Sequence, residues 1–362
     1  MNAEQAYLFR HVLVRDAAYE LQLPAERAAL HDLAAGTMLA VLPPPLDAVA
    51  HEIAAHLRLG GRQPELERQY TLLAARYAHG TFSHSVAIPL LERLAEIGTE
   101  SNVIEAYQLL YAILRAHRND QAGAMRYALL LVRYGRARGV PVAVAQGLNY
   151  LAGLADDRRA VRLWRRAFRL AVKAQAWMVA AISIGNLGSH YTGTRDHRRA
   201  RRLFVSSIRL NEKAGNEAGV GFFLSSLSGQ LRHLGDLEGA LAASRRSIAI
   251  LEGMGAKRYL PTAYGHYAAA LDVLGRFDES EHWLAKAYTI ADEIQLQREF
   301  WKLAVHRALV ALERGRVDDA QAYWQRALAW LRDNGTAADI QQARADLRAA
   351  CARLAIPDDG RW

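Results

Sequence analysis

The fold of this chain of 362 residues is decided by the stretch Gly185-Asn186-Leu187-Gly188-Ser189-His190-Tyr191, followed by Ala200, Phe204 and Ser207. Small and bulky residues stand at fixed spacings, as is needed where two helices approach closely and larger side chains fill the gaps beside them. The pattern recurs every forty residues. At the position of Ala200 stand Ala160, Ala240, Ser280 and Ala320, and at that of Ser207 stand Ala167, Ser247, Ala287 and Ala327.

The spacing resembles the tetratricopeptide (TPR) repeat, a helix-turn-helix unit. This resemblance implies an all-α, right-handed TPR α-solenoid of helix-turn-helix pairs, here with 40-residue repeats, similar to the long units of bacterial regulatory and peptide-sensing proteins. Gly235, Gly275 and Gly315 also recur at forty residues, where the turn between two helices needs positive φ. Arg195 interrupts this column. We therefore expect the turn at Arg195 to differ from the later ones.

Proline, glycine and the repeat together predict the order of the helices. From residue 141 we expect five pairs: 141–154 with 157–173, 177–193 with 197–213, 217–233 with 237–253, 257–273 with 277–293, and 297–313 with 317–332. The predicted domains are an N-terminal helical segment 1–62, degenerate repeats 63–140, five TPR-like repeats 141–335, and a C-terminal capping helix and tail 336–362. A polar outer face is what such a cap needs.

The N-terminal segment carries a second resemblance. Residues 7–20, YLFRHVLVRDAAYE, and then Arg27, Leu30 and His31, are similar to the "F-x-H-x-L-V-R-D-A-A-Y-E … R-x-x-L-H" linker that precedes the TPR sensor in bacterial signal-transduction ATPases and transcriptional activators. No G-x-x-x-x-G-K-[ST] phosphate loop occurs in the sequence, so the ATPase itself is not expected. The resemblance implies that this segment contacts an effector or a second copy of the chain.

Composition and motifs favour a protein that binds rather than catalyses. A hydrophobic content of 51% supports a continuous core, and the single cysteine, Cys351, points to a reducing compartment. We expect a cytoplasmic protein that does not enter a membrane. His51 and His56 are five residues apart, unlike the four of a helical zinc motif, and no nucleophile motif occurs. The prediction is no enzyme, no cofactor and no metal.

The first helices of the pairs carry the candidate binding groove. In a TPR stack these helices line the concave face, and polar residues recur on it at forty-residue steps. Side-chain amides and guanidinium groups there can grip the main chain of an extended peptide, although a solvated face is polar without any ligand. The predicted groove residues are Gln146, Asn149, Asn186, Ser189, Phe222, Ser226, Arg232, His266, Asp272 and His306.

The net charge of +9 comes from one region, because residues 156–213 hold fourteen Lys or Arg and four Asp or Glu. The second helices of two repeats carry most of them, and we expect these helices on the convex back. This patch fits a solvated surface, an acidic partner protein or nucleic acid. It comprises Arg158, Arg159, Arg162, Arg165, Arg166, Arg198, Arg199 and Arg202.

The sequence therefore predicts a non-catalytic TPR protein that binds a protein or peptide in its concave groove, as a sensor or scaffold in bacterial signalling or regulation. The alternative is a regulatory module whose basic convex patch binds nucleic acid or an acidic partner. The two readings depend on different residues. Groove binding depends on Asn149, Asn186 and Arg232, whereas the patch depends on its arginines and loses affinity steeply as salt rises.

Overall fold

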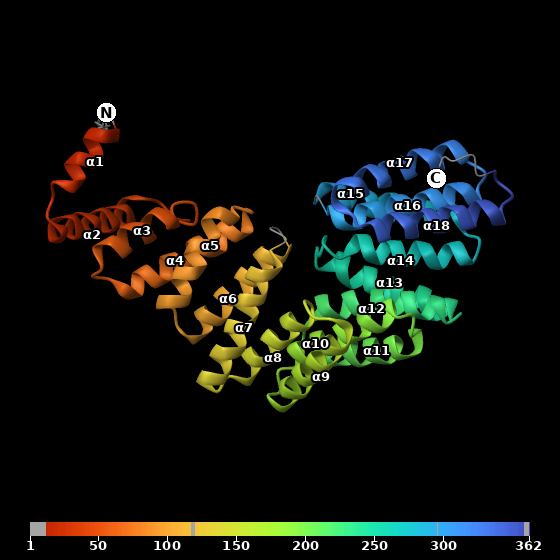
Figure 1. Cartoon of the computed structure of the whole chain (residues 1–362), viewed down its shortest axis with the longest axis horizontal. Coiled ribbons are helices and arrows are strands. Elements are labelled where there is room, and N and C mark those ends of the chain that lie inside the picture. Colours follow the sequence, from red (N-terminus) through yellow and green to blue (C-terminus); the bar gives the residue numbers. More distant parts are fainter. Residues whose placement is uncertain (1–11, 117–119, 295, 358–361) are drawn as a thin grey trace. The chain divides into compact units, whose positions relative to one another are not determined.

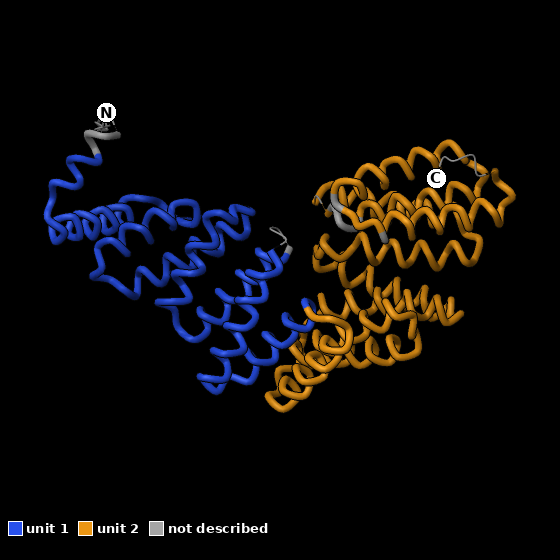
Figure 2. The backbone as a smooth tube through the Cα atoms, viewed as in Figure 1, with its two compact units in different colours: residues 1–154 blue, residues 155–362 orange. Residues whose placement is uncertain are grey.

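The computed structural model describes residues 12–116, 120–294, 296–357 and 362. These residues form α-helices and no β-strand, which confirms the predicted all-α repeat fold. They divide into two compact units, residues 1–154 and 155–362 (Figure 2). The boundary falls between the helices of the first predicted pair, and the predicted domain limits stay predictions.

In unit 1, from α2 onward, each helix packs against the next one in the chain. Ala75 and Ala87 are fully buried together with Leu91 and Leu94. The helices of unit 1 are α1 (Val12–Glu20), α2 (Pro24–Val41), α3 (Ala50–Gly60), α4 (Pro64–Gly80), α5 (His84–Ile97), α6 (Glu100–Ala116), α7 (Gln121–Arg138) and α8 (Pro141–Ala152).

In unit 2 the helices again pack in chain order, and first helices of neighbouring repeats also touch: α12 packs on α14, and α14 on α16 (Figure 1). Its helices are α9 (Asp157–Lys173), α10 (Trp177–Gly193), α11 (His197–Lys213), α12 (Glu217–His233), α13 (Leu237–Gly253), α14 (Leu260–Val273), α15 (Phe277–Glu293), α16 (Gln297–Glu313), α17 (Val317–Asn334) and α18 (Ala337–Arg353). Helices α11, α13, α15 and α17 begin forty residues apart, which is the predicted period.

Local sequence explains why these helices begin where they do. The side chains of Asp156, Asp196 and Asp236 each accept a hydrogen bond from the backbone N–H three residues later, at 2.9, 3.0 and 2.9 Å. Such N-caps satisfy backbone donors that the first turn of a helix leaves unpaired. Because the three aspartates are forty residues apart, the repeat fixes the start of α9, α11 and α13.

The turn between the helices of a pair is the same in four repeats. Gly235, Gly275 and Gly315 have φ of 81°, 70° and 71°, and Arg195 has φ of 58°. The expectation that the Arg195 turn differs is therefore wrong. The packing of the flanking helices holds an arginine in the left-handed region that glycine occupies elsewhere, at a cost in backbone strain.

The core of unit 2 follows the small-and-bulky pattern. Ala200, Phe204 and Ser207 are buried, with no more than 1% of each exposed. Ser207 is more than a small residue, because its hydroxyl donates to the carbonyl of Ala181 at 2.9 Å. Forty residues later Ser247 donates to the carbonyl of Gly221 at 2.6 Å. These bonds tie the second helix of each repeat to the first.

Candidate ligand-binding site

The ten predicted groove residues fall in both units. Gln146 and Asn149 lie on α8 in unit 1, and the other eight lie on α10, α12, α14 and α16 in unit 2. Gln146 accepts a hydrogen bond from the side-chain amide of Gln108 at 2.7 Å, so part of its polar capacity is used within unit 1. Asn149 is buried, and its Oδ1 has no hydrogen-bond partner among the described residues.

At the start of unit 2 the predicted residues serve local structure. Ser189 and Ser226 donate their hydroxyl hydrogens to carbonyls of their own helices, those of Gly185 at 3.3 Å and Phe222 at 3.2 Å. Asn186 is half-buried. The ring of Phe222 packs edge-on against Tyr259, with centroids 5.4 Å apart, so it belongs in part to the core. These side chains do not gather around one hollow.

Three other predicted residues do gather. Arg232 of α12, Asp272 of α14 and His306 of α16 line one hollow of about 820 Å³. Its floor is apolar and includes Val273 and Leu309. The forty-residue period explains the convergence, because the three residues come from first helices of successive repeats that pack side by side. The hollow is therefore built on packed helices, which hold side chains more firmly than loops do.

The last helix supplies one wall of this hollow. Asp346 and Arg353 of α18 line it opposite the repeat helices, and α18 packs on α16. Arg353 donates to Glu313 at 3.1 Å, which joins the wall to α16. The sequence had suggested only a solubilising cap for this helix. The alternation of charged residues with alanines on α18 is the one sequence feature that could have indicated a second, ligand-facing role.

The polar groups in the hollow are only partly satisfied by one another. His306 Nε2 donates to Asp272 Oδ2 at 2.5 Å. The other carboxylate oxygen, Asp272 Oδ1, and the Nε of Arg232 are buried atoms with no hydrogen-bond partner among the described residues. A buried donor or acceptor without a partner costs about 1–3 kcal/mol. Two residues that line the hollow therefore carry a donor and an acceptor that the described residues leave unsatisfied.

Burial changes the pKa values of Arg232 and of its neighbour His233. Burial lowers the pKa of Arg232, and Asp272 acts in the opposite direction. The Nη2 of Arg232 donates to His233 Nε2 at 3.0 Å, since an arginine can only donate. Burial, and after it the charge of Arg232, lowers the pKa of His233 to about 4. His233 is therefore neutral near pH 7 and can accept this bond.

His266 lines a second, smaller hollow of about 160 Å³, and Ala269 and His306 line both hollows. Its Nδ1 lies 2.7 Å from the carbonyl oxygen of Ser225, and because a carbonyl only accepts, Nδ1 carries the proton. Burial lowers the pKa of His266 to about 4. At neutral pH its Nε2 is therefore an acceptor. Four predicted residues, Arg232, His266, Asp272 and His306, thus surround two adjoining hollows.

The eight basic-patch residues lie on α9 and α11, and all are exposed. Helices α9 and α11 both pack against α10. A hollow of about 610 Å³ on α9 is lined by Arg162, Arg165, Arg166, Phe168 and Arg169. The patch shares no residue with the hollows around Arg232 and His266.

The described residues include no cluster of three or more His, Cys, Asp or Glu side chains arranged to hold a metal ion. His56, one member of the histidine pair weighed above, instead places its Nδ1 2.8 Å from Nδ1 of His31. None of the helices in the described ranges combines the length and hydropathy needed to cross a bilayer.

Comparisons with known proteins identify the fold. No protein-family model and no curated protein matches the chain. Among solved structures, the apo form of RapI has a TM-score of 0.57 at 16% identity, covering 74% of this chain and 98% of RapI. The quorum sensor NprR from B. thuringiensis, apo form, has 0.57 at 12% identity and covers 96% of both chains. The structure of NprR in complex with its cognate peptide NprX has a TM-score of 0.52 at 12% sequence identity. The match covers 84% of this chain and 92% of NprR.

A signal transduction ATPase with numerous domains and a tetratricopeptide-repeat sensor, from Pyrococcus horikoshii, has a TM-score of 0.53 at 14% identity. The match covers 96% of this chain and 56% of the ATPase. At these low identities the four structures establish one thing, that this chain has the fold of TPR-like helical repeat proteins.

Proposed function

We propose that the chain is a non-catalytic regulator that binds a peptide, or an extended segment of a partner protein, along the first helices of unit 2. The binding site comprises the hollows around Arg232, His266, Asp272 and His306. Through this site the chain acts as a sensor or scaffold in bacterial signalling or regulation.

One observation carries the proposal: Arg232 Nε and Asp272 Oδ1 are buried and unpartnered, and the two residues line the same hollow. A peptide amide has one acceptor, its C=O, and one donor, its N–H. An extended peptide would satisfy both atoms, with one of its C=O groups on Arg232 and one of its N–H groups on Asp272. A hydrogen bond to a charged group contributes about 1.5–3 kcal/mol. The apolar floor around Val273 and Leu309 would receive an aliphatic side chain of the same peptide.

Two further points support this choice. Polar residues also occur beyond the hollows, at Ser226 on α12 and at Ser189 and Asn186 on α10, so an extended peptide would find further polar groups on the first helices. The fold is shared with NprR, whose structure holds its cognate peptide.

We assign the N-terminal segment, residues 12–62, to contact with an effector or with a second copy of the chain. Large apolar side chains are exposed there: Leu21, Leu23, Leu30, Leu33 and Val41 are each at least 50% exposed. Tyr7, Leu8 and Phe9, which begin the linker resemblance, lie outside the described residues.

A peptide selection tests the binding site. Random 12-residue peptides displayed on phage are selected on the full chain, and enriched peptides are synthesised with a fluorophore and measured by fluorescence polarisation. The double variant Arg232→Gln, Asp272→Asn removes both charges; it keeps the side-chain volume at position 272 and shortens the side chain at position 232. We expect it to weaken binding tenfold or more, since a charged hydrogen bond contributes about 1.5–3 kcal/mol.

The matched control is Arg332→Gln, Asp333→Asn, which makes the same charge changes at exposed positions on α17. This control should bind as the wild type does, and circular dichroism should show equal helicity for all three proteins. If no peptide is enriched, or if enriched peptides bind the double variant as tightly as the wild type, the proposal is wrong.

A further inference from the structure

Among the described residues, the exposed patch arginines of α9 and α11 almost all lack carboxylate partners. Of the eight patch residues, Arg199 forms an ion pair, with Asp196 at 3.2 Å, and within the described residues the other seven form none. They are Arg158, Arg159, Arg162, Arg165, Arg166, Arg198 and Arg202. Their positive charge is therefore not neutralised by the chain's own acidic groups.

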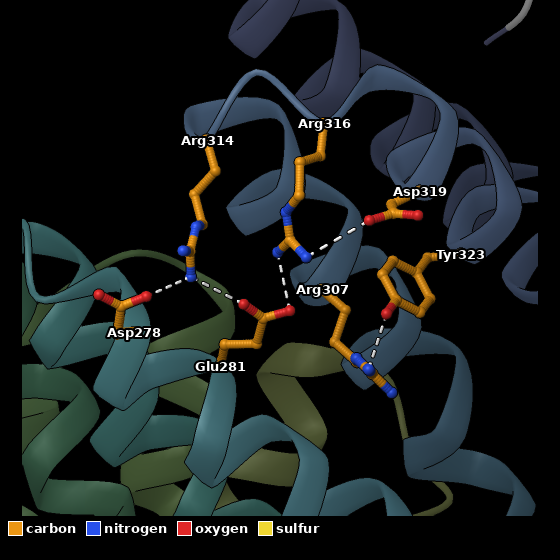
Figure 3. A network of polar contacts seen from close by, with 7 residues as sticks. All are labelled: Asp278, Glu281, Arg307, Arg314, Arg316, Asp319 and Tyr323. Carbon is orange, nitrogen blue, oxygen red and sulfur yellow. Dashed lines mark hydrogen bonds and ion pairs between the residues drawn. The ribbon is translucent and has the colours of Figure 1, made fainter.

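In the later repeats several arginines are paired with carboxylates. Arg314 pairs with Asp278 at 2.5 Å and with Glu281 at 2.9 Å. Arg316 pairs with Glu281 at 2.7 Å and with Asp319 at 3.3 Å. Figure 3 shows these carboxylates from α15 and α17 reaching the two arginines between α16 and α17. Carboxylates of the chain therefore neutralise some arginines of the later repeats, whereas among the described residues they neutralise only one of the eight patch arginines.

The charge at one position of the repeat differs between the early and the late second helices. The place occupied by Arg158 on α9 and Arg198 on α11 is occupied by Glu238, Asp278 and Asp318 on the next three second helices. At the last position of these helices, α9 and α11 have Lys173 and Lys213, whereas the equivalent positions of the next three second helices hold Gly253, Glu293 and Asp333. The same site on the second helix thus changes from basic to acidic along unit 2. Two of these acidic side chains are paired within the chain, Asp278 with Arg314 and Glu293 with Lys257.

The arginines of α9 form a continuous row. Arg158, Arg162, Arg165 and Arg169 are spaced four, three and four residues apart, which places them on one side of the helix over about 16 Å. Arg198 and Arg202 repeat the first two positions on α11. This regular row of guanidinium groups matches a partner with regularly spaced anionic groups.

The surroundings of the row select the class of partner. Protein interfaces combine arginine with aromatic residues and are otherwise depleted of charge at their centres, whereas protein–DNA interfaces are much more positively charged. Few aromatic faces are available to stack on unpaired bases: Phe204 is buried, Trp164 and Phe168 are half-buried, and Phe168 is the one aromatic residue among the five that line the arginine hollow. This arrangement disfavours single strands, which are bound by stacking on aromatic side chains. What remains is contact with phosphates alone.

We infer that the arginine face of α9 and α11 binds the phosphate backbone of double-stranded DNA without reading its bases. Guanidinium groups bind phosphate oxygens through charge-assisted, often bidentate, hydrogen bonds. The inference does not depend on the peptide site, because none of the residues involved lines the hollows of Arg232 and His266.

The test uses a fluorescently labelled 30-base-pair duplex of random sequence and measures its binding to the full chain between 50 and 300 mM salt. The variant is Arg162→Ser, Arg166→Ser, Arg202→Ser. Each lost phosphate contact should reduce the slope of log K against log salt by about 0.9, and affinity at 0.1 M salt should fall about a hundredfold or more.

The control variant, Arg245→Ser, Arg326→Ser, Arg332→Ser, removes the same charge from exposed positions on α13 and α17. It should keep most of the affinity and the slope, as should the double variant at Arg232 and Asp272. Equal losses in the patch and control variants would show that net charge alone is responsible and would overturn the inference. So would tighter binding of labelled poly-glutamate than of the duplex, which would assign the patch to an acidic protein.

Discussion

Replacing Gly185 by alanine should destabilise unit 2, because the helix α10 has no room for a methyl group there. A Cβ at this position would lie 2.2 Å from two ring carbons of Phe223 and 3.0 Å from the hydroxyl oxygen of Ser207. Neither neighbour can move freely. Phe223 is buried, with its ring 6.1 Å from that of Phe204, and Ser207 is held by its bond to Ala181.

The magnitude follows from the distances. Carbon atoms in contact prefer a separation of about 3.5–4.0 Å, so the Phe223 ring or the whole helix must move by more than ~1 Å. Overpacking of this kind costs about 1–3 kcal/mol. Alanine recovers up to about 1 kcal/mol through its better helix propensity. We expect a net loss of about 1–2 kcal/mol in the free energy of unfolding.

Gly193→Ala is the matched control, because Gly193 ends the same helix and a Cβ there would meet no atom within 4 Å. It should leave stability unchanged or raise it by up to about 1 kcal/mol. Urea denaturation followed by circular dichroism at 222 nm measures both variants. Equal stabilities for wild type and Gly185→Ala would refute the argument that close helix approach at Gly185 determines the packing.

Two further predictions concern a turn and a histidine. Arg195→Gly should raise the free energy of unfolding by about 0.5–1 kcal/mol. Glycine avoids the strain of the left-handed conformation at φ of 58°, and this gain is reduced because glycine has more conformational freedom in the unfolded chain. Urea denaturation measures the change, and a loss of stability would contradict the prediction. His266 has a pKa of about 4 when folded and about 6.5 when unfolded, so the unfolded state binds the proton first as pH falls. Stability should therefore drop between pH 6.5 and 4, by up to about 3 kcal/mol, and His266→Gln should lack this part of the drop in urea titrations at each pH.

The helices could be predicted closely because the packing pattern and the turns repeat together. The predicted ranges 177–193, 197–213, 217–233 and 237–253 agree with α10, α11, α12 and α13 at both ends. In each range an N-cap or a turn residue stands at a fixed distance from the buried small residues. The helix boundary and the packing pattern therefore had to agree with each other. Arg195 shows the limit, because packing imposes a backbone conformation that its residue type does not favour.

The sequence could predict the candidate site only as a set of polar residues at repeated positions on the first helices. Forty-residue steps placed Arg232, Asp272 and His306 on first helices, but the step cannot show that Gln146 is engaged by Gln108 while Asp272 Oδ1 has no partner. That difference depends on distances of a few ångströms between side chains of different helices. The position of α18 beside the hollow was likewise not predictable, since a final helix has no following repeat to fix its register.

The distribution of charge separates the two proposed binding surfaces. The hollow beside α18 contains carboxylates, those of Asp272, Glu313 and Asp346, as well as the guanidinium groups of Arg232 and Arg353. A phosphate backbone entering it would meet these carboxylates in a partly buried place, where like charges repel more strongly than in water. A peptide amide has no net charge and avoids this cost. On α9 the arginines are exposed to water, so water would compete with the peptide for their hydrogen bonds. Salt should therefore weaken duplex binding steeply and peptide binding only slightly.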